Sequence, residues 1–562
     1  MKRLILGTIP DDFQPKRDIP LGPWCFLGRE NVYPGWESLQ FEPDPFSTPE
    51  SLHEASQKTC AYANSLVPLL VPKLNHQNDV FYSNRFWRLM LLPWLISLVQ
   101  TTWFNLCCIE RFIKKHKGER FEVELMPNSI EWKFKDTLDF LYKGALNPIF
   151  ENWLYSKIIA GICPDNWVIV YKEKQLEQDK DIKEKISWMR LLYEKMFFNR
   201  RCKGVYGIGF IGSLVWSIFL SMKPSVGLEE SNDDVTNSYS DNEIKWPFDF
   251  LQIVNETMPV CFKNLNINTK RRYKTKKGKI HLIGPLLYYN ENDKFRYGIA
   301  VENWEKLICT QHGGMYGIAK TYPYPSEIEY KQYSFLSWGW AKQVDYRGNI
   351  QALPSPYLSK YHNKHKQKTS NLIMVCTSAL LYPMRLQSSP QPVQKLRYRA
   401  NKVQFLEALD NRIFNETLYR PFFDDRGALK ERPFLEKIFP TLQYCVGKLH
   451  PQILKCKLLV MDNPDTTLNI ALAANIPTIG FWDKQSWAMA KQAIPFFDTL
   501  ENAGILFQKG QDAAKKINEI WDDVESWWSQ ELVQKARKNW CYQYARTSKF
   551  WWWEWIKELW RV

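Results

Sequence analysis

The sequence is poor in the residues that build metal centres and disulfide scaffolds. Histidine is scarce, with 8 residues in 562, and the 12 cysteines are scattered without a C-x-x-C pair. This spacing fits neither a zinc ribbon nor a small disulfide-bonded domain. His362 and His365 have the spacing HxxH, but they would need two further ligands from elsewhere to hold a metal ion. We therefore expect reduced thiols, and no cluster of residues suggests a metal site or another cofactor.

The amino-terminal residues lack the features of a secretory signal. Residues 1–6 form a charged turn that leads into a short apolar run, without a continuous apolar core or a small-residue cleavage site. The expected location is therefore cytoplasmic, with the inner face of the cytoplasmic membrane as a further option.

One uncharged segment, residues 204–222 (GVYGIGFIGSLVWSIFLSM), has a length and basic flanks that permit a membrane span. Its four glycines and three serines make its transfer from water into a bilayer only weakly favourable. A span at this position would also place the halves of an α/β domain on opposite sides of a bilayer. We expect a buried or interfacial helix, with membrane contact as the alternative.

The residues that are abundant are apolar and basic. Hydrophobic residues make up 45% and aromatic residues 15% of the chain, which is a globular composition. Lys and Arg outnumber Asp and Glu by 75 to 60, and the net charge of +15 favours anionic partners such as nucleotides or an anionic membrane. No motif that combines aromatic and basic residues accompanies this charge, so we expect no nucleic-acid partner.

Short apolar strands alternate with helical stretches along most of the chain. Residues 3–8, 120–126 and 167–172 have the character of strands, and helical patterns lie between them. Residues 353–370 form a Pro-rich, basic connection before a fresh strand at 371–376. This order predicts the α/β fold class, with a domain boundary at the connection.

A compact strand–helix–strand unit is the clearest fold signal in the second half. The apolar run 457–461 ends at Asp462, Thr466 and Thr467 precede a helix, and residues 476–481 form the next strand. Hydroxyls and free N–H groups at a helix amino terminus can hold a phosphate. An ordinary helix cap would use the same two threonines, so both interpretations stay open.

Residues 307–340 contain the most distinctive stretch of the chain, LICTQHGGMYGIAKTYPYPSEIEYKQYSFLSWGW. A short apolar strand breaks at once into Gln311, His312, Gly313 and Gly314. Glycines let a backbone approach a ligand, and polar residues at the carboxyl end of a strand lie where open α/β sheets bind ligands. The alternative is a tight turn with a histidine that only forms hydrogen bonds. We interpret the stretch as a ligand site.

The motifs QHGGMYG (311–317) and LSWGW (336–340) resemble the signature of a family of surface-carbohydrate (polysaccharide) biosynthesis transferases. Supporting resemblance comes from the tyrosine, serine and arginine run that begins at Tyr82 and from DNPDTTLNIALAANIPTIGF (462–481). In spacing, the resemblance covers most of the chain.

The resemblance implies two Rossmann-like domains that face a cleft, as in GT-B glycosyltransferases. Residues 1–355 would form the acceptor-side α/β domain with helical insertions, 356–370 the linker and 371–515 the nucleotide-sugar domain. Residues 516–562 would be C-terminal helices that cross back to the first domain. The implied enzyme is a metal-independent glycosyltransferase that moves a sugar from a nucleotide-activated donor to a growing surface glycan or lipid-linked acceptor. We favour a CMP-linked acidic sugar as donor.

The resemblance also assigns roles to residues. His312 and Gln311 are the expected catalytic residues, and Thr466 and Thr467 are expected to hold the nucleotide. Related transferases often carry a glutamate on the helix that follows, where this chain has only Asn469 as a substitute. The other expected donor or substrate contacts are Gly313, Gly314, Tyr316, Ser337, Trp338, Asp462, and Arg420 or Arg426 as a phosphate clamp.

Two other functions remain open from the sequence. A polyol-phosphate transferase with a CDP-activated donor would share the fold and a histidine–glycine loop. A non-catalytic, membrane-associated assembly protein would use the glycines and threonines as turns and caps. Its tryptophans and its basic runs, such as residues 270–279, would contact lipid.

Overall fold

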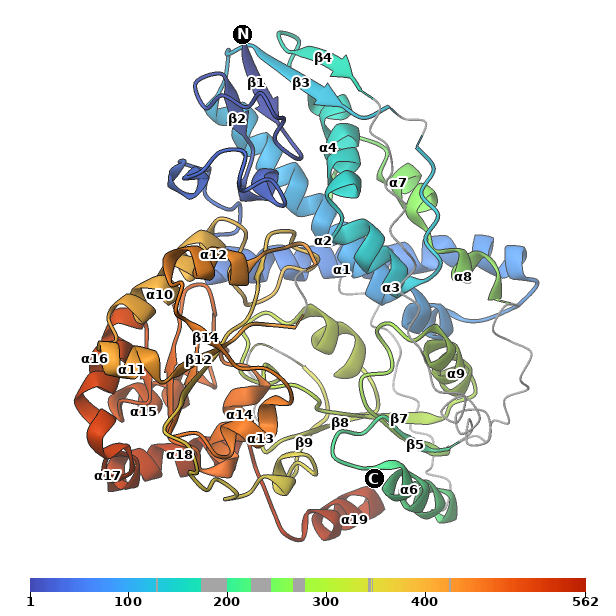
Figure 1. The fold of residues 1–562 in the computed structure, drawn as a ribbon. Helices are drawn as coiled ribbons and strands as arrows, with labels where there is room; N and C mark the ends of the chain where they lie inside the picture. The colour runs from blue at the N-terminus through green and yellow to red at the C-terminus, as the bar shows by residue number, and fades with distance from the viewer. Residues whose placement is uncertain are drawn as a thin grey trace.

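The structure is a computed structural model. It describes residues 1–127, 130–172, 200–223, 244–265, 278–341, 345, 347–423 and 426–561. Within these residues the chain forms three parallel sheets, a 4-stranded, a 5-stranded and a 6-stranded one, together with a 2-stranded antiparallel pair (Figure 1). The predicted α/β class is confirmed in this form, since several parallel sheets alternate with helices. Residues 229–243 (EESNDDVTNSYSDNE), whose polar composition predicts a surface loop, and most of the basic run 270–279 lie outside the described residues.

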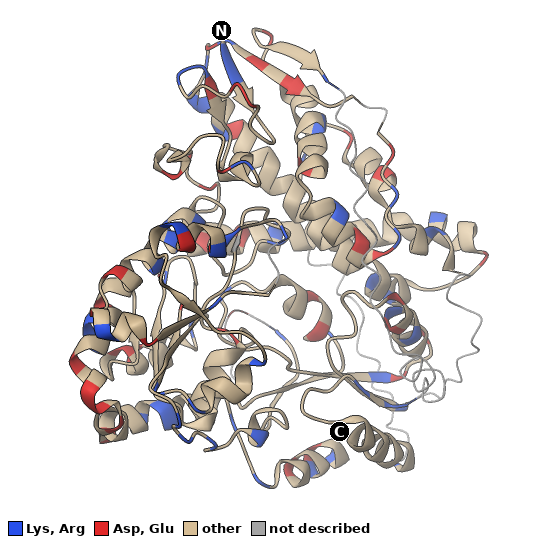
Figure 2. Cartoon of the chain, viewed as in Figure 1, with Lys and Arg blue, Asp and Glu red and all other residues tan. Residues whose placement is uncertain are grey.

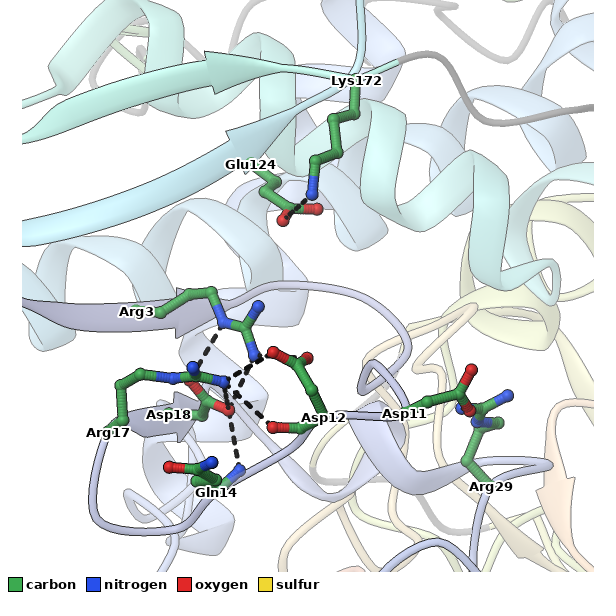
Figure 3. A network of polar contacts seen from close by, with 9 residues as sticks. All are labelled: Arg3, Asp11, Asp12, Gln14, Arg17, Asp18, Arg29, Glu124 and Lys172. Carbon is green, nitrogen blue, oxygen red and sulfur yellow. Dashed lines mark hydrogen bonds and ion pairs between the residues drawn. The ribbon is translucent and has the colours of Figure 1, made fainter.

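The first sheet has the order β2-β1-β3-β4 and contains β1 (Lys2–Ile5), β2 (Asp18–Pro20), β3 (Phe121–Leu125) and β4 (Val168–Tyr171). A buried carboxylate joins its first two strands (Figure 3). Asp18 accepts hydrogen bonds of 2.8 Å from both Arg3 and Arg17. Burial raises the pKa of Asp18, but the bonds from Arg17, Arg3 and the Gln14 N–H outweigh it and lower the pKa to about 2.

Two long helices lie between the first sheet and the rest of the molecule. They are α1 (Pro49–Asn78), which Thr48 caps, and α2 (Asn84–Lys115), which Ser83 caps (Figure 1). Of the described helices, α2 alone is long and apolar enough to cross a bilayer, and 94% of its most apolar window is buried inside the protein. It is therefore a core helix. The helices α4 (Pro148–Ile162) and α9 (Glu291–Glu302) pack beside it.

The second sheet has the order β5-β6-β7-β8-β9. It consists of β5 (Cys202–Lys203), β6 (Ile280–Ile283), β7 (Lys306–Thr310), β8 (Ser334–Ser337) and β9 (Ile350–Ala352), all paired in parallel. Its inner strands are apolar or buried at almost every position, as expected for a sheet covered on both faces. The range 1–355, predicted as one domain, thus carries two separate sheets.

The third sheet has the order β14-β12-β10-β15-β16-β17. Its strands are β10 (Leu372–Val375), β12 (Thr417–Arg420), β14 (Gln443–Tyr444), β15 (Leu458–Met461), β16 (Thr478–Phe481) and β17 (Leu506–Phe507). The predicted strand–helix–strand unit is β15, α14 (Thr466–Ala474) and β16. The helices α10 (Gln394–Glu407) and α16 (Gly510–Ile520) pack together on this sheet.

The chain returns to the second sheet at its carboxyl end. After α18 (Glu531–Tyr544), helix α19 (Trp551–Arg561) packs beside α6 (Phe210–Met222) in a small core of its own. Trp555 is buried there and donates a 2.9 Å hydrogen bond to the Pro354 carbonyl, and Lys223 donates one of 2.7 Å to the Leu559 carbonyl. The terminal helix therefore closes over residues that precede it by about two hundred positions or more.

Candidate functional site

The two most distinctive sequence motifs meet in space. The glycine loop that follows β7 lies against the amino end of α14, which follows β15. The Gly314 N–H donates a 2.9 Å hydrogen bond to the Thr466 hydroxyl and a 3.3 Å bond to the Asp465 carboxylate. A Cβ at Gly314 would lie 2.4 Å from Asp465 C and Thr466 N, so a side chain does not fit. The carboxyl ends of the second and third sheets thus face each other across this contact.

Gln311 holds the glycine loop in place. Its side chain is buried, donates a 2.8 Å bond to the Gly313 carbonyl, and accepts bonds of 2.8 Å from the Trp338 N–H and 2.9 Å from the Trp340 indole. Ser337 is also buried, and its hydroxyl donates to the carbonyls of Trp340 and Gln351. The QHGG and LSWGW motifs therefore form two loops that are hydrogen-bonded to each other through the Gln311 side chain. We call these two loops the loop pair.

His312 has a buried carboxylate partner that the sequence did not reveal. Its Nε2 lies 3.2 Å from Glu329, whose side chain is 0% exposed. The Tyr316 hydroxyl contacts the same Nε2 and donates a 2.6 Å hydrogen bond to the other Glu329 oxygen. A carboxylate favours the tautomer with hydrogen on Nε2, which leaves the lone pair on Nδ1. No described residue is hydrogen-bonded to Nδ1, so this nitrogen is available as a base.

The hydroxyl groups around this pair remain protonated at neutral pH. Burial, together with the nearby Glu329 charge, raises the pKa of Tyr316 well above its usual value, and the same holds for Tyr288. The two hydroxyls lie 3.2 Å apart. They are therefore fixed hydrogen-bond donors and acceptors that hold the carboxylate and the imidazole in one geometry.

A cavity of about 330 Å³ adjoins the glycine loop. Met315 and Tyr322 form its wall on the loop side, Asp465 lies at the amino end of α14, and Thr377 and Ser378 follow β10. The opening thus lies at the carboxyl end of a parallel sheet and beside a helix amino terminus. This is the position where doubly wound sheets bind nucleotides.

Two cations line the cavity without an acidic partner. No described carboxylate lies within 4.0 Å of Arg385 or Lys395. Arg385 lies 4.3 Å from the centre of the Tyr324 ring, and its buried Nε has no hydrogen-bond partner among the described residues. Lys395 is 4% exposed and donates only a 3.3 Å bond, to the Ser378 carbonyl. Burial, and then the charge of Lys402, lowers the pKa of Lys395 to about 7.

A partner-free buried cation is costly, and its usual compensation is a bound anion. Arg385 and Lys395 thus place two cations on a cavity at the carboxyl end of a parallel sheet, where α/β proteins bind phosphates.

Comparison with known protein families identifies the chain as a transferase, because the model of the LIC12162 family transferase matches residues 2–559. The chain belongs to that family. A search of curated proteins found no match.

The family assignment confirms the predicted transferase. It covers nearly the whole chain, so both sheets that meet at the site, and the helices that cross back, belong to the transferase unit. The match does not depend on the glycine loop alone.

Several residues predicted as contacts lie elsewhere in the transferase. Asp462 is buried at the end of β15, where it accepts bonds from the Thr377 N–H at 3.1 Å and from the Tyr398 hydroxyl. Asn469 is buried, and its oxygen accepts a 2.9 Å bond from the Trp540 indole. Trp338 packs its ring on Tyr357. These side chains stabilise the walls of the site.

The two arginines predicted as a phosphate clamp do not line the cavity. Arg420 donates a 2.9 Å hydrogen bond to the Cys445 carbonyl, and the Arg426 guanidinium lies 3.5 Å from the centre of the Tyr142 ring. Thr467 is half-buried in the first turn of α14. The cations that line the cavity are instead Arg385 and Lys395.

Sequence reasoning missed Glu329, Arg385 and Lys395. Glu329 was visible as an acid between the two motifs, on a π-helical turn (Pro325–Glu329) of the kind often found at functional sites. Arg385 and Lys395 lie among prolines and other basic residues and carry no local signal. As for metals, no group of three or more candidate ligands occurs among the described residues. His362 bonds Thr547, and His365 bonds the Cys456 carbonyl.

Proposed function

We propose that this transferase is a glycosyltransferase that moves a sugar from a nucleotide-activated donor to a hydroxyl of a surface glycan. The observation that carries the proposal is the contact between the glycine loop of His312 and the amino end of α14. This contact sets a histidine–carboxylate pair near a cavity lined by the half-buried Arg385 and the buried Lys395, neither of which has an acidic partner among the described residues. A base and an anion pocket in adjacent positions are what transfer from a nucleotide donor requires.

The cavity would take the phosphate end of the donor. Arg385 and Lys395 supply positive charge, and the dipole of α14 adds partial positive charge at its amino end. These groups would stabilise the nucleotide phosphate as the bond from the sugar to the phosphate oxygen breaks. Because the leaving charge is met by protein groups, the proposed reaction needs no metal ion.

His312 would act on the acceptor. As the acceptor oxygen bonds to the anomeric carbon, Nδ1 takes the hydroxyl proton, and Glu329 stabilises the imidazolium that forms. Gln311 acts only as a positioning residue, since its amide is fully bonded inside the loop pair. Tyr316 has the same kind of role through its bond to Glu329.

Thermal unfolding with added nucleotides tests the proposal. A ligand at about a hundred times its dissociation constant adds roughly 2.7 kcal/mol of stability. We expect one of CMP, CDP, UDP and GDP to stabilise the protein, with CMP as the first choice, and Arg385→Met to lose the shift. Arg432→Met, which alters an exposed arginine on α12 (Glu431–Ile438), is the matched control and should keep it.

The outcomes separate the candidate functions. A response to CMP with transfer of an acidic sugar supports the proposal. A response to CDP with a product that gains a phosphate would instead identify a polyol-phosphate transferase. If no nucleotide stabilises a folded protein, and sugar transfer depends neither on Arg385 nor on His312, the proposed site is wrong.

A further inference from the structure

Helix α6 exposes an apolar stripe to solvent. Its thirteen residues, FIGSLVWSIFLSM, include no charged side chain. One face packs on the second sheet through Trp216 and Leu220. On the opposite face, residues at helical spacing are largely exposed: Ile211 at 77%, Val215 at 60%, Ile218 at 62% and Met222 at 77%. A helix that is apolar all round is normally buried on every side, so this face lacks a partner in the described structure.

Helix α19 extends the apolar surface and adds positive charge at its edge. Its exposed positions are three tryptophans and two basic residues, namely Trp552, Trp553, Lys557, Trp560 and Arg561. Its two acids are held by cations: Glu554 pairs with Arg546 at 2.7 Å, and Glu558 lies 3.8 Å from Arg561. The outward face of α19 therefore combines indole rings with unneutralised positive charge at Lys557.

The two helices form one continuous surface. Figure 1 shows α6 and α19 side by side at the lower edge of the molecule, and Figure 2 shows α6 without charged residues. The Phe219 and Trp560 rings lie 6.0 Å apart, and Trp216 stacks on Trp551. We call this surface, made of the exposed side chains of both helices, the α6–α19 face.

The chemistry of the α6–α19 face matches a lipid surface. Tryptophan prefers the boundary between headgroups and acyl chains, and lysine and arginine reach from there to anionic headgroups. Thirteen helical residues span only about 20 Å, which is shorter than the roughly 30 Å core of a bilayer, so α6 could lie in the interface but not cross. Lys549, exposed just before α19, adds a further cation.

We propose that the α6–α19 face docks the protein onto an anionic lipid bilayer, with the α6 stripe and the α19 tryptophans inserted at the headgroup boundary. A second protein copy would cover the apolar stripe equally well, but the two acids of its α19 are already paired and would leave Lys557 without an anionic partner. The charge at the edge therefore favours an anionic surface. This inference does not depend on the proposed sugar transfer, because it uses a separate surface.

Vesicle flotation tests the inference. The full-length protein should float with vesicles that contain phosphatidylglycerol and should remain mostly unbound with pure phosphatidylcholine. Ile211→Ser, Ile218→Ser and Met222→Ser combined should weaken binding at least tenfold, and Lys557→Glu should weaken it and reduce its salt dependence. A matched control replaces exposed apolar residues elsewhere, Phe81→Ser with Leu532→Ser, and should bind as the wild type does.

Two results would overturn the inference. One is unchanged vesicle binding by the triple variant, provided that circular dichroism and thermal unfolding without added nucleotide show that the variant is folded. The other is a dimer in sedimentation that dissociates in the triple variant, without vesicle binding by the wild type. In that case the α6–α19 face is the contact between two copies.

Discussion

Replacing Lys395 by methionine should make the ligand-free transferase more stable. The buried ammonium has no acidic partner among the described residues, and its pKa falls from 10.5 to about 7 on folding. Each pKa unit corresponds to about 1.4 kcal/mol, so the charged lysine costs up to about 5 kcal/mol below pH 7. Between about pH 7 and pH 10.5, Lys395 is neutral in the native protein but still protonated in the unfolded chain. Because the unfolded state then binds more protons, the free energy of unfolding rises with pH over this range. The cost should shrink to about 2 kcal/mol at pH 9.

Guanidinium unfolding at pH 6 and pH 9, followed by tryptophan fluorescence, measures this difference. Lys395→Met should exceed the wild type in stability by several kcal/mol at pH 6 and by less at pH 9. The same variant should lose the stabilisation by nucleotide, because the cation that meets the phosphate is gone. A gain in stability with a loss of binding is the signature of a charge kept for function.

Lys402→Met is the matched control for this experiment. Lys402 is equally buried on α10, but it forms a 2.8 Å ion pair with Glu431. Its removal breaks this buried ion pair, leaves Glu431 with the longer 3.4 Å contact to Arg399, and should cost up to about 3–5 kcal/mol. If Lys395→Met is destabilised in the same way, or if its effect does not change between pH 6 and pH 9, then Lys395 is not a partner-free buried cation and the anion pocket is wrong.

Three further predictions address the catalytic pair, the domain contact and the first sheet. Glu329→Gln should lower kcat about a hundredfold or more with little change in fold, because an amide favours the wrong His312 tautomer; steady-state kinetics and circular dichroism check this. Gly314→Ala should lose about 1–3 kcal/mol of stability in thermal unfolding, whereas Gly313→Ala, whose Cβ meets nothing closer than 3.6 Å, should not. Asp18→Asn should cost about 2 kcal/mol at neutral pH and converge with the wild type as pH falls towards 2, since the stability from a lowered carboxyl pKa is lost on protonation; acid titration of unfolding measures it.

Much of the local structure was predictable because its signals are local. The buried strands β10, β15 and β16 are short apolar runs between polar turns, and the amino end of α14 follows an aspartate that caps it. The glycine loop after β7 was recognisable for the same reason. The packing of Trp555 and Leu559 in the core beside α6 also agrees with the return of the terminal helices that the family resemblance implied.

Other features depend on contacts between residues far apart in the chain. Asn469 has the sequence position of a ligand contact but faces Trp540, because α18 packs on that side of α14. Arg420 ends β12 and Arg426 lies after it, as ligand-binding residues often do, yet Arg420 donates to the Cys445 carbonyl and Arg426 lies over the Tyr142 ring. The direction of a side chain depends on its neighbours in space, which local patterns do not specify.

The sequence by itself determined the fold class, the glycine loop with its histidine, and the threonine turn at the start of α14. Only the tertiary structure decided that these two loops touch, that Glu329 is the partner of His312, and that Arg385 and Lys395 line one cavity. The physical reason is one of range. Hydrophobic periodicity and turn chemistry act over a few residues, whereas the charge balance of a buried site is the sum over side chains that only the packed chain brings together.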